Sequence, residues 1–156
     1  MQEQVIERMV IAASPEDCYA VLTDFEHYSD WAADVKTVHV DSTDDQGRAA
    51  VVTFRAAAFG RSTSYTLRYD YEGAPSAIAW VQVDGDLTGQ LDGRYQLSPS
   101  EGGGTDIEYR LVVDLKVPLP GFVKRRAEGR IMGTALKDLK SFVEAQEPSS
   151  TPAGRG

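Results

Sequence analysis

Residues 106–146 read DIEYRLVVDLKVPLPGFVKRRAEGRIMGTALKDLKSFVEAQ, and the spacing of the apolar residues changes within this stretch. Up to residue 115, apolar and polar residues alternate, which is typical of a strand with one buried face. After Pro118 and Pro120 the spacing becomes helical, and it predicts one helix over residues 121–146 that covers the sheet. The apolar stripe expected on this helix consists of Ile131, Met132, Ala135, Leu136, Leu139, Phe142 and Val143.

Upstream of this stretch, from residue 35 onward, short β-favouring runs are separated by turn signals. These signals lie at residues 44–47, 60, 73–75, 84–86 and 102–104. Strands joined by tight turns form an antiparallel meander. Residues 65–71 alternate in the same way as residues 106–115, so one face of the predicted sheet is apolar and the other faces water.

The N-terminal part predicts a strand over residues 5–13 followed by a helix. Ser14 is a good N-cap, Pro15 suits the first helical position, and two acidic residues follow them. Apolar residues then recur at helical spacing, so we expect one face of this region to pack inward. These residues are Cys18, Val21, Leu22 and Phe25, with Tyr28 and Trp31 extending the face.

Composition and charge predict an ordinary globular protein. Hydrophobic residues make up 42% of the 156-residue chain and charged residues 26%, so we expect one domain over residues 1–146 and a disordered tail over 147–156. A formal charge of −8 disfavours partners that are bound through phosphates, such as nucleic acid and anionic membranes. The single Cys18 cannot form an internal disulfide. With no signal peptide or membrane-spanning run recognised, we expect a cytoplasmic monomer or weak homodimer.

The inward positions of the predicted sheet carry many tyrosines. A dry core favours Leu, Ile and Val, and buried tyrosines need partners for their hydroxyls, so this face suggests a lined cavity. The alternative is that the hydroxyls reach solvent at the rim of the sheet. The inward residues in question are Phe54, Tyr65, Leu67, Tyr69, Tyr95, Leu97 and Tyr109.

Two glycines and a charge pair stand out in the predicted long helix. Gly129 and Gly133 each cost about 1 kcal/mol relative to alanine, so they either admit a close strand or leave volume for a ligand. Arg125 and Glu128 lie at and near the apolar stripe. They could anchor a polar group of a ligand, or they could form a solvated pair where the helix overhangs the sheet.

Four stretches of the sequence resemble one protein family. They are similar to the polyketide cyclase/dehydrase and coenzyme-Q-binding branch of the START and Bet v 1-like superfamily. The four stretches are LTDFEHYSDW at 22–31, GRYQLSP at 93–99, GT at 104–105 and PLPGF at 118–122. The resemblance covers residues 3 to about 145. A departure is Ala32-Ala33, where many relatives have a proline.

This resemblance implies an α+β helix-grip fold. A curved antiparallel sheet of about seven strands would wrap around the long C-terminal helix, with two short helices after the first strand. It also implies a hydrophobic cavity between the sheet and that helix, because members bind lipids, isoprenoid quinones, polyketides or hormones there. Chemistry differs among members, so the fold alone does not assign an activity.

The sequence offers no clear metal, nucleotide or nucleophile site. His27 and His39 are too few and too far apart in sequence for a metal centre. The glycine segments at 85–89 and 102–104 lie between strands, so neither is a phosphate-binding loop. No serine has the strand-turn-helix context of a nucleophile elbow. We therefore expect no cofactor and no metal.

The leading hypothesis is a protein that binds or carries a hydrophobic small molecule such as a lipid, an isoprenoid quinone or a polyketide-like compound. The expected ligand-binding residues are Trp31, Phe54, Tyr65, Tyr69, Trp80, Tyr95, Tyr109, Phe122, Arg125, Glu128, Gly129, Met132 and Leu136. A second hypothesis is a polyketide aromatase/cyclase or dehydratase, with catalytic candidates Tyr65, Tyr69, Tyr109 and Glu128. A third is a protein-interaction module resembling ribosome-associated relatives.

Overall fold

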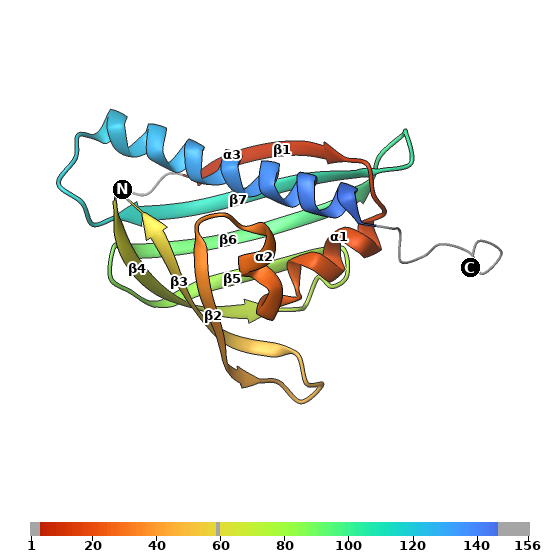
Figure 1. Ribbon diagram of the computed structural model, residues 1–156, viewed down its shortest axis with the longest axis horizontal. Helices are drawn as coiled ribbons and strands as arrows, with labels where there is room; N and C mark the ends of the chain where they lie inside the picture. The colour runs from red at the N-terminus through yellow and green to blue at the C-terminus, as the bar shows by residue number, and fades with distance from the viewer. Residues whose placement is uncertain (1–3, 59, 147–156) are drawn as a thin grey trace.

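The computed structural model describes residues 4–58 and 60–146 (Figure 1). Seven strands and four helical segments follow one another along the chain. They are β1 (Gln4–Ile11), α1 (Pro15–Leu22), η1 (Phe25–His27), α2 (Tyr28–Trp31), β2 (Val35–Thr43), β3 (Ala49–Ala58), β4 (Arg61–Asp70), β5 (Ala77–Gly85), β6 (Thr88–Pro99), β7 (Thr105–Leu115) and α3 (Gly121–Ala145). The disordered tail predicted for residues 147–156 lies outside the described residues.

The seven strands form one antiparallel sheet in the order β1-β7-β6-β5-β4-β3-β2. Strands β2 to β7 are a meander, and β1 closes the sheet by pairing with β7. All five turns predicted from glycine, proline and aspartate signals fall at the junctions between consecutive strands of this meander. The predicted α+β helix-grip architecture is therefore confirmed.

The helices cover the two edges of the sheet. Helix α3 makes its main strand contacts with β1 and β7, whereas α2 packs against β2 at the other edge. Figure 1 shows α3 running along the sheet, with α1 and α2 beside its second half. Because α2 also touches α3, the helices bridge the central strands without packing directly on all of them.

Local sequence explains where α1 begins. The Ser14 hydroxyl accepts a hydrogen bond from the Asp17 backbone N–H at 3.1 Å, and Pro15 occupies the first turn, as the sequence predicted. Cys18 and Leu22 are fully buried on one face of this helix. Strand β1 ends at Ile11, two residues before the predicted boundary.

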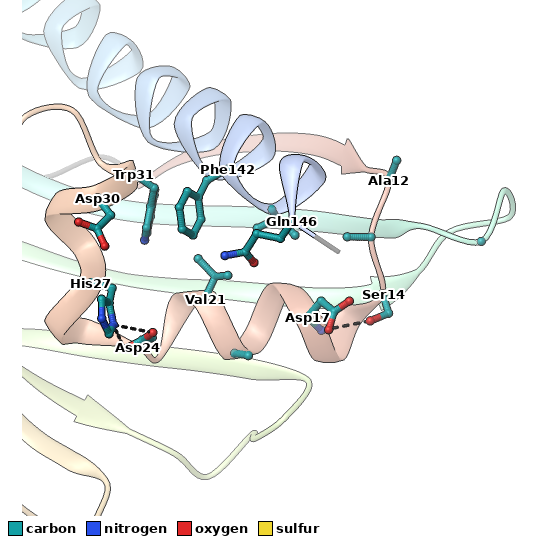
Figure 2. A pocket seen from close by; sticks show the side chains of 14 residues that line it. Ala12, Ser14, Asp17, Val21, Asp24, His27, Asp30, Trp31, Phe142 and Gln146 are labelled. Carbon is teal, nitrogen blue, oxygen red and sulfur yellow. Dashed lines mark hydrogen bonds and ion pairs between the residues drawn. The ribbon is translucent and has the colours of Figure 1, made fainter. Parts of the chain in front are cut away.

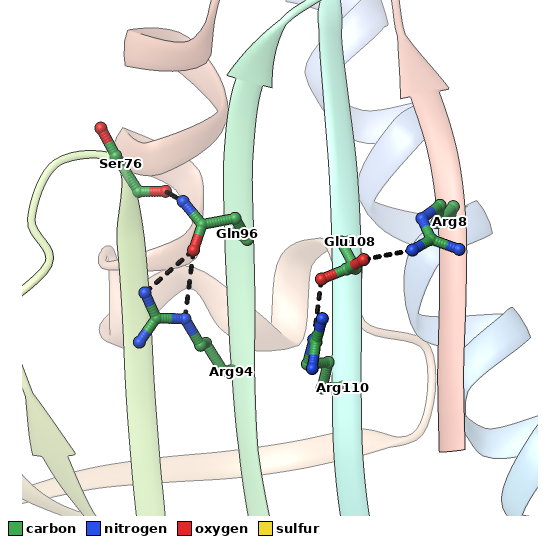
Figure 3. A network of polar contacts seen from close by, with 6 residues as sticks. All are labelled: Arg8, Ser76, Arg94, Gln96, Glu108 and Arg110. Atoms are coloured by element: carbon green, nitrogen blue, oxygen red, sulfur yellow. Dashed lines mark hydrogen bonds and ion pairs between the residues drawn. The ribbon is translucent and has the colours of Figure 1, made fainter. Parts of the chain in front are cut away.

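The outer face of the sheet is polar. Glu108 of β7 accepts hydrogen bonds from Arg110 of the same strand at 2.7 Å and from Arg8 of β1 (Figure 3). These contacts hold the pKa of Glu108 below its ordinary value, chiefly through the hydrogen bond from Arg110. On β6, Arg94 donates to the Gln96 side chain, and Gln96 donates to the Ser76 carbonyl. The alternation of β7 therefore separates a wet face from an apolar face, as predicted.

The buried stripe of α3 is narrower than the sequence suggested. Its apolar members are Met132, Leu136, Leu139 and Val143, each at most 2% exposed. Ile131 is 39% exposed, so its predicted place in the stripe is wrong. A Cβ added at Gly129 or Gly133 would meet no atom within 4 Å, which excludes a closely packed strand as the reason for these glycines.

We predict that truncation of the buried stripe destabilises the fold. Leu139 is completely buried, so Leu139→Ala should lower the free energy of unfolding by about 2–5 kcal/mol in urea denaturation. Phe122→Ala on the same helix is the control, because Phe122 is 61% exposed and its truncation should change stability by less than about 0.5 kcal/mol. Equal effects of the two changes would contradict this description of α3.

Candidate functional site

A cavity of about 160 Å³ lies between the apolar face of the sheet, α2 and the second half of α3. Aromatic rings form most of its wall, small α3 side chains form its roof, and the α2–β2 loop forms one side. The lining residues are Tyr28, Trp31, Ala32, Ala33, Asp34, Val35, Phe54, Ala56, Tyr65, Leu67, Tyr69, Trp80, Leu91, Tyr95, Tyr109, Ile131, Thr134, Ala135 and Asp138.

Strand register pairs the sheet aromatics, and Phe25 of η1 connects the first pair to the second. Its ring centroid lies 6.4 Å from Phe54 and 4.6 Å from Tyr69, so the rings form one aromatic row. Three pairs lie directly opposite each other on neighbouring strands, which is the arrangement in which side chains interact most closely across a sheet. Their ring centroids are 5.3, 5.9 and 4.4 Å apart, and Trp80 connects the second pair to the third at 5.4 Å. The three pairs are Phe54–Tyr65, Tyr69–Trp80 and Tyr95–Tyr109.

Helix α2 closes the row at the β2 edge. The Tyr28 ring lies 4.8 Å from Trp31 and 5.6 Å from Phe54, measured between ring centroids. The Tyr28 hydroxyl donates a hydrogen bond to the Leu22 carbonyl at the end of α1. This bond holds the two helical segments together and fixes the phenol as part of the wall.

Helix α3 contributes a different face from its buried stripe. Ile131, Thr134, Ala135 and Asp138 are spaced three, one and three residues apart, so they lie on one side of the helix. Thr134 and Ala135 are small, and they leave the space beneath α3 unfilled. Asp138 also accepts a hydrogen bond from the Ala33 backbone N–H at 3.0 Å, which ties α3 to the α2–β2 loop.

Seven of the predicted ligand-binding residues come together on this cavity. They are Trp31, Phe54, Tyr65, Tyr69, Trp80, Tyr95 and Tyr109. Six others lie away from it. Phe122 and Arg125 face solvent near the start of α3, and Glu128, Met132 and Leu136 point into the core rather than the cavity. Gly129 borders open space and does not line the cavity.

The residues that the prediction missed carry weak sequence signals. Alternation had already placed Leu67 on the inward face, and Ala56 shares strand parity with Phe54, so alternation alone could have found it too. Predicting the remaining lining residues would require knowing how the helices cross the sheet. These residues are 32–35 in the α2–β2 loop and 131, 134, 135 and 138 in α3. No local pattern indicates that crossing.

The phenols of the cavity are neutral hydrogen-bonding groups. Burial raises the pKa of Tyr65 to about 12, and it also raises the pKa values of Tyr28, Tyr69, Tyr95 and Tyr109. Such groups donate and accept hydrogen bonds, but they are poor general bases near neutral pH. The cavity is therefore better suited to binding a neutral molecule than to proton abstraction by tyrosine.

A second hollow of about 700 Å³ lies between α1, α2 and the last turns of α3 (Figure 2). This groove is wide and has an acidic lining that includes Asp17, Asp24 and Asp30. His27 bonds Asp24 at 2.8 Å, which raises the pKa of the imidazole. Within the described part of the chain, no three His, Cys, Asp or Glu side chains gather as a metal site would require. The aromatic cavity, rather than this groove, has the apolar lining of a ligand site.

The chain matches a known family over most of its length. A family model described as "Polyketide cyclase / dehydrase and lipid transport" matches residues 2–144. Among curated proteins, no sequence matches this chain significantly. In the described residues, no helix has both the length and the apolar character that crossing a membrane demands.

Solved structures share the fold at low sequence identity. A START superfamily protein from Mycobacterium smegmatis has a TM-score of 0.86 and 24% identity over 92% of this chain and 98% of that one. The Zhui aromatase/cyclase from Streptomyces sp. R1128 has a TM-score of 0.82 and 15% identity over 98% and 100%. TTHA0849 from Thermus thermophilus has a TM-score of 0.74 and 21% identity over 92% and 98%. These likenesses establish the fold.

We predict that the tyrosines ionise late in the folded protein. Burial is the largest cause of a raised pKa at each of the seven tyrosines, so most of the phenolate absorbance should appear above pH 10 and return to its ordinary range in urea. A raised folded pKa stabilises the native state fully below pH 10, and this contribution is lost as the pH rises through about 12. A native titration in which most of the phenolate signal has formed by pH 10 would contradict this description.

Proposed function

The chain belongs to the polyketide cyclase/dehydrase and lipid transport family, and from this premise we propose that it binds and carries a neutral, compact apolar molecule in the aromatic cavity. One observation carries the proposal: an unfilled space of about 160 Å³ walled by aromatic rings of five neighbouring strands and α2. A cavity of this kind would gain free energy by removing apolar ligand surface from water.

The size of the cavity favours a small ligand. Sites for drug-sized molecules usually enclose about 300–1,000 Å³, so this space is smaller than most of them. A molecule of one or two fused rings, or a short acyl chain, fits this limit better than a long isoprenoid quinone. Breaking the Ala33–Asp138 hydrogen bond would let the α2–β2 loop separate from α3 and make room for a larger ligand.

The charge of the lining favours a neutral ligand. Asp34 and Asp138 are the acidic residues among the described lining, and no Lys or Arg accompanies them there. A ligand carboxylate would lose its hydration without meeting a cation. We therefore favour a neutral aromatic compound over a fatty acid anion.

The direct test is native mass spectrometry of gently purified protein, followed by solvent extraction. We expect a neutral apolar compound of one or two rings, or a short acyl compound, bound one to one. Protein that carries no such compound and also fails to bind tetralin, a neutral bicyclic hydrocarbon, would contradict the proposal. Tetralin binding can be followed by fluorescence, because both tryptophans of the chain line the cavity.

We predict that filling the cavity from α3 abolishes this binding. Ala135→Leu places three further carbon atoms in the space, so tetralin should bind at least about tenfold more weakly in the fluorescence titration. Ala145→Leu is the matched control, because Ala145 is exposed at the end of the same helix and outside the cavity. Unchanged binding in Ala135→Leu would place the ligand elsewhere.

A second candidate function is cyclisation or dehydration of a polyketide. The Asp34 carboxylate lies close enough to Tyr65 to contribute to that phenol's raised pKa, so an acid/base group stands at the cavity wall. In this alternative Asp34 moves the proton, and the aromatic wall holds the substrate. We therefore favour Asp34 as the catalytic candidate over the tyrosines and Glu128.

The two functions differ in their response to Asp34→Asn. If the protein is a cyclase, this variant should lose turnover of a linear poly-β-ketone thioester by about a hundredfold or more while still binding tetralin. Asp30→Asn, in the acidic groove, is the control and should keep its turnover. Wild-type protein that binds tetralin but shows no turnover would support the carrier function and contradict the cyclase alternative.

A further inference from the structure

The first half of α3 carries a basic surface in an otherwise acidic protein. Six of the 16 Lys and Arg residues lie within residues 116–137, but only one of the 24 acidic residues does. That acid, Glu128, is 7% exposed and belongs to the buried side of the helix. Arg125, Arg126 and Arg130 are exposed. The net charge of −8 therefore does not describe this end of the molecule.

The exposed arginines of this surface have no acidic partner in the part of the chain that the structure describes. The ion pairs found there involve other cations, and none includes Arg125, Arg126 or Arg130. Arg126 and Arg130 are four residues apart, and like charges at this spacing weaken a helix. An anionic surface would relieve that repulsion.

An exposed aromatic ring lies at the start of the same surface. Phe122 is 61% exposed, which is the highest value among the exposed large hydrophobic residues of the described chain. Phe122, Arg126 and Arg130 follow one another at intervals of four residues, so they lie on one side of the helix. An apolar ring beside cations is typical of helices that rest on the interface between lipid headgroups and acyl chains.

The two glycines of α3 lie on this side as well. Gly129 follows Arg126 by three residues, and Gly133 follows Arg130 by three. A Cβ at either glycine would meet no atom within 4 Å, so packing inside the protein does not explain them. Because no side chain projects at these positions, a flat surface can approach the helix and reach both arginines.

The acidic groove is too far away to cancel the charge of this surface. Arg126 and Phe142, which lines the groove, lie about 24 Å apart along one helix at about 1.5 Å per residue. This distance is about three Debye lengths at physiological ionic strength. Figure 1 shows the start of α3 and helix α1 toward opposite ends of the molecule. The groove aspartates therefore repel an anionic surface at the start of α3 only weakly.

We propose that the side of α3 formed by Phe122, Arg126 and Arg130 is a docking surface for membranes that contain anionic phospholipid. The arginines bind headgroup phosphates, and Phe122 enters the layer between the headgroups and the acyl chains. No residue from 116 to 130 lines the cavity or the acidic groove, so this surface is separate from both. An exposed ring among cations can enter a fluid bilayer without a groove shaped to receive it, which favours a membrane over an acidic protein as the partner.

Vesicle flotation with the full-length protein tests the docking surface. Vesicles of about 70% phosphatidylcholine and 30% phosphatidylserine should bind the wild-type protein at least about tenfold more tightly than pure phosphatidylcholine vesicles. Because salt screens the attraction, about 1 M salt should release the protein from the mixed vesicles. Wild-type protein that does not bind the mixed vesicles at low salt would overturn the proposal.

Two double variants that change the net charge equally separate the docking surface from the overall charge. Arg126→Gln with Arg130→Gln should weaken binding to the mixed vesicles about 25-fold, because each cation near an anionic membrane contributes about fivefold. Arg55→Gln with Arg68→Gln, at exposed positions of β3 and β4, should stay within about twofold of wild type. Equal losses in the two variants would mean that overall charge, and not this surface, governs binding, and the proposal would be wrong.

Substitutions of Phe122 test whether the ring enters the membrane. Phe122→Ala should weaken binding to the mixed vesicles about tenfold, because the ring leaves water on insertion. Val83→Ala is the control, since Val83 is 43% exposed on β5 and lies outside the docking surface. Phe122→Trp should bind like wild type and shift its fluorescence to the blue, whereas Trp31 and Trp80 are already buried. Full binding by Phe122→Ala, or no blue shift in Phe122→Trp, would contradict insertion of the ring.

Two further measurements separate the membrane from other partners and from the cavity. Binding to beads that carry poly-L-glutamate, without binding to the mixed vesicles, would assign the surface to an acidic protein and refute the membrane proposal. Ala135→Leu, which fills the cavity, should bind the mixed vesicles like wild type, because Ala135 lies outside the docking surface. Loss of vesicle binding in this variant would contradict a docking surface that is separate from the cavity.

Discussion

The arrangement of this protein depends on how α3 packs against the sheet. Its buried stripe, centred on Leu136 and Leu139, meets β1 and β7 at one edge, while α2 covers β2 at the other. The helices thus cover part of the apolar centre of the sheet from its edges, and α1 also contacts the central strand β6. Because close packing is satisfied at the edges, the space above the central strands is bounded but not filled.

The aromatic character of this space follows from the strand register. Antiparallel pairing sets Phe54 opposite Tyr65, Tyr69 opposite Trp80 and Tyr95 opposite Tyr109, so that the aromatic side chains form one surface. The raised pKa values keep the phenols uncharged. Small α3 side chains such as Ala135 then face rings instead of interlocking with them. A mainly apolar space with a few polar groups is the combination that binds small molecules selectively.

The sequence predicted the elements and the aromatic wall because both leave periodic signals. The alternation in residues 106–115 and the cap at Ser14 depend on neighbours along the chain, which are visible in one sequence. The position of the helix over the sheet is not visible there. Helical periodicity placed Ile131, Met132, Ala135 and Leu136 on one stripe, but it did not show that Met132 and Leu136 enter the core whereas Ile131 and Ala135 line the cavity.

The predicted polar anchors lie away from the cavity for the same reason. Arg125 and Glu128 lie before the part of α3 that crosses the aromatic row, and only the three-dimensional path of the helix reveals this. Trp80 lines the cavity, although polar residues share its strand parity further along β5. The irregular register between β4 and β5 at Thr66 and Leu67 breaks the simple alternation there and leaves Trp80 facing inward.

Xenon binding in a crystal would show whether unfilled apolar space lies beneath α3, on which ligand binding depends. Xenon occupies apolar cavities without needing a hydrogen-bond partner. We expect xenon density between the aromatic row and Ala135 in crystals held under xenon gas. Clear density for an interior filled by side chains, with xenon absent from it, would mean that no such space exists.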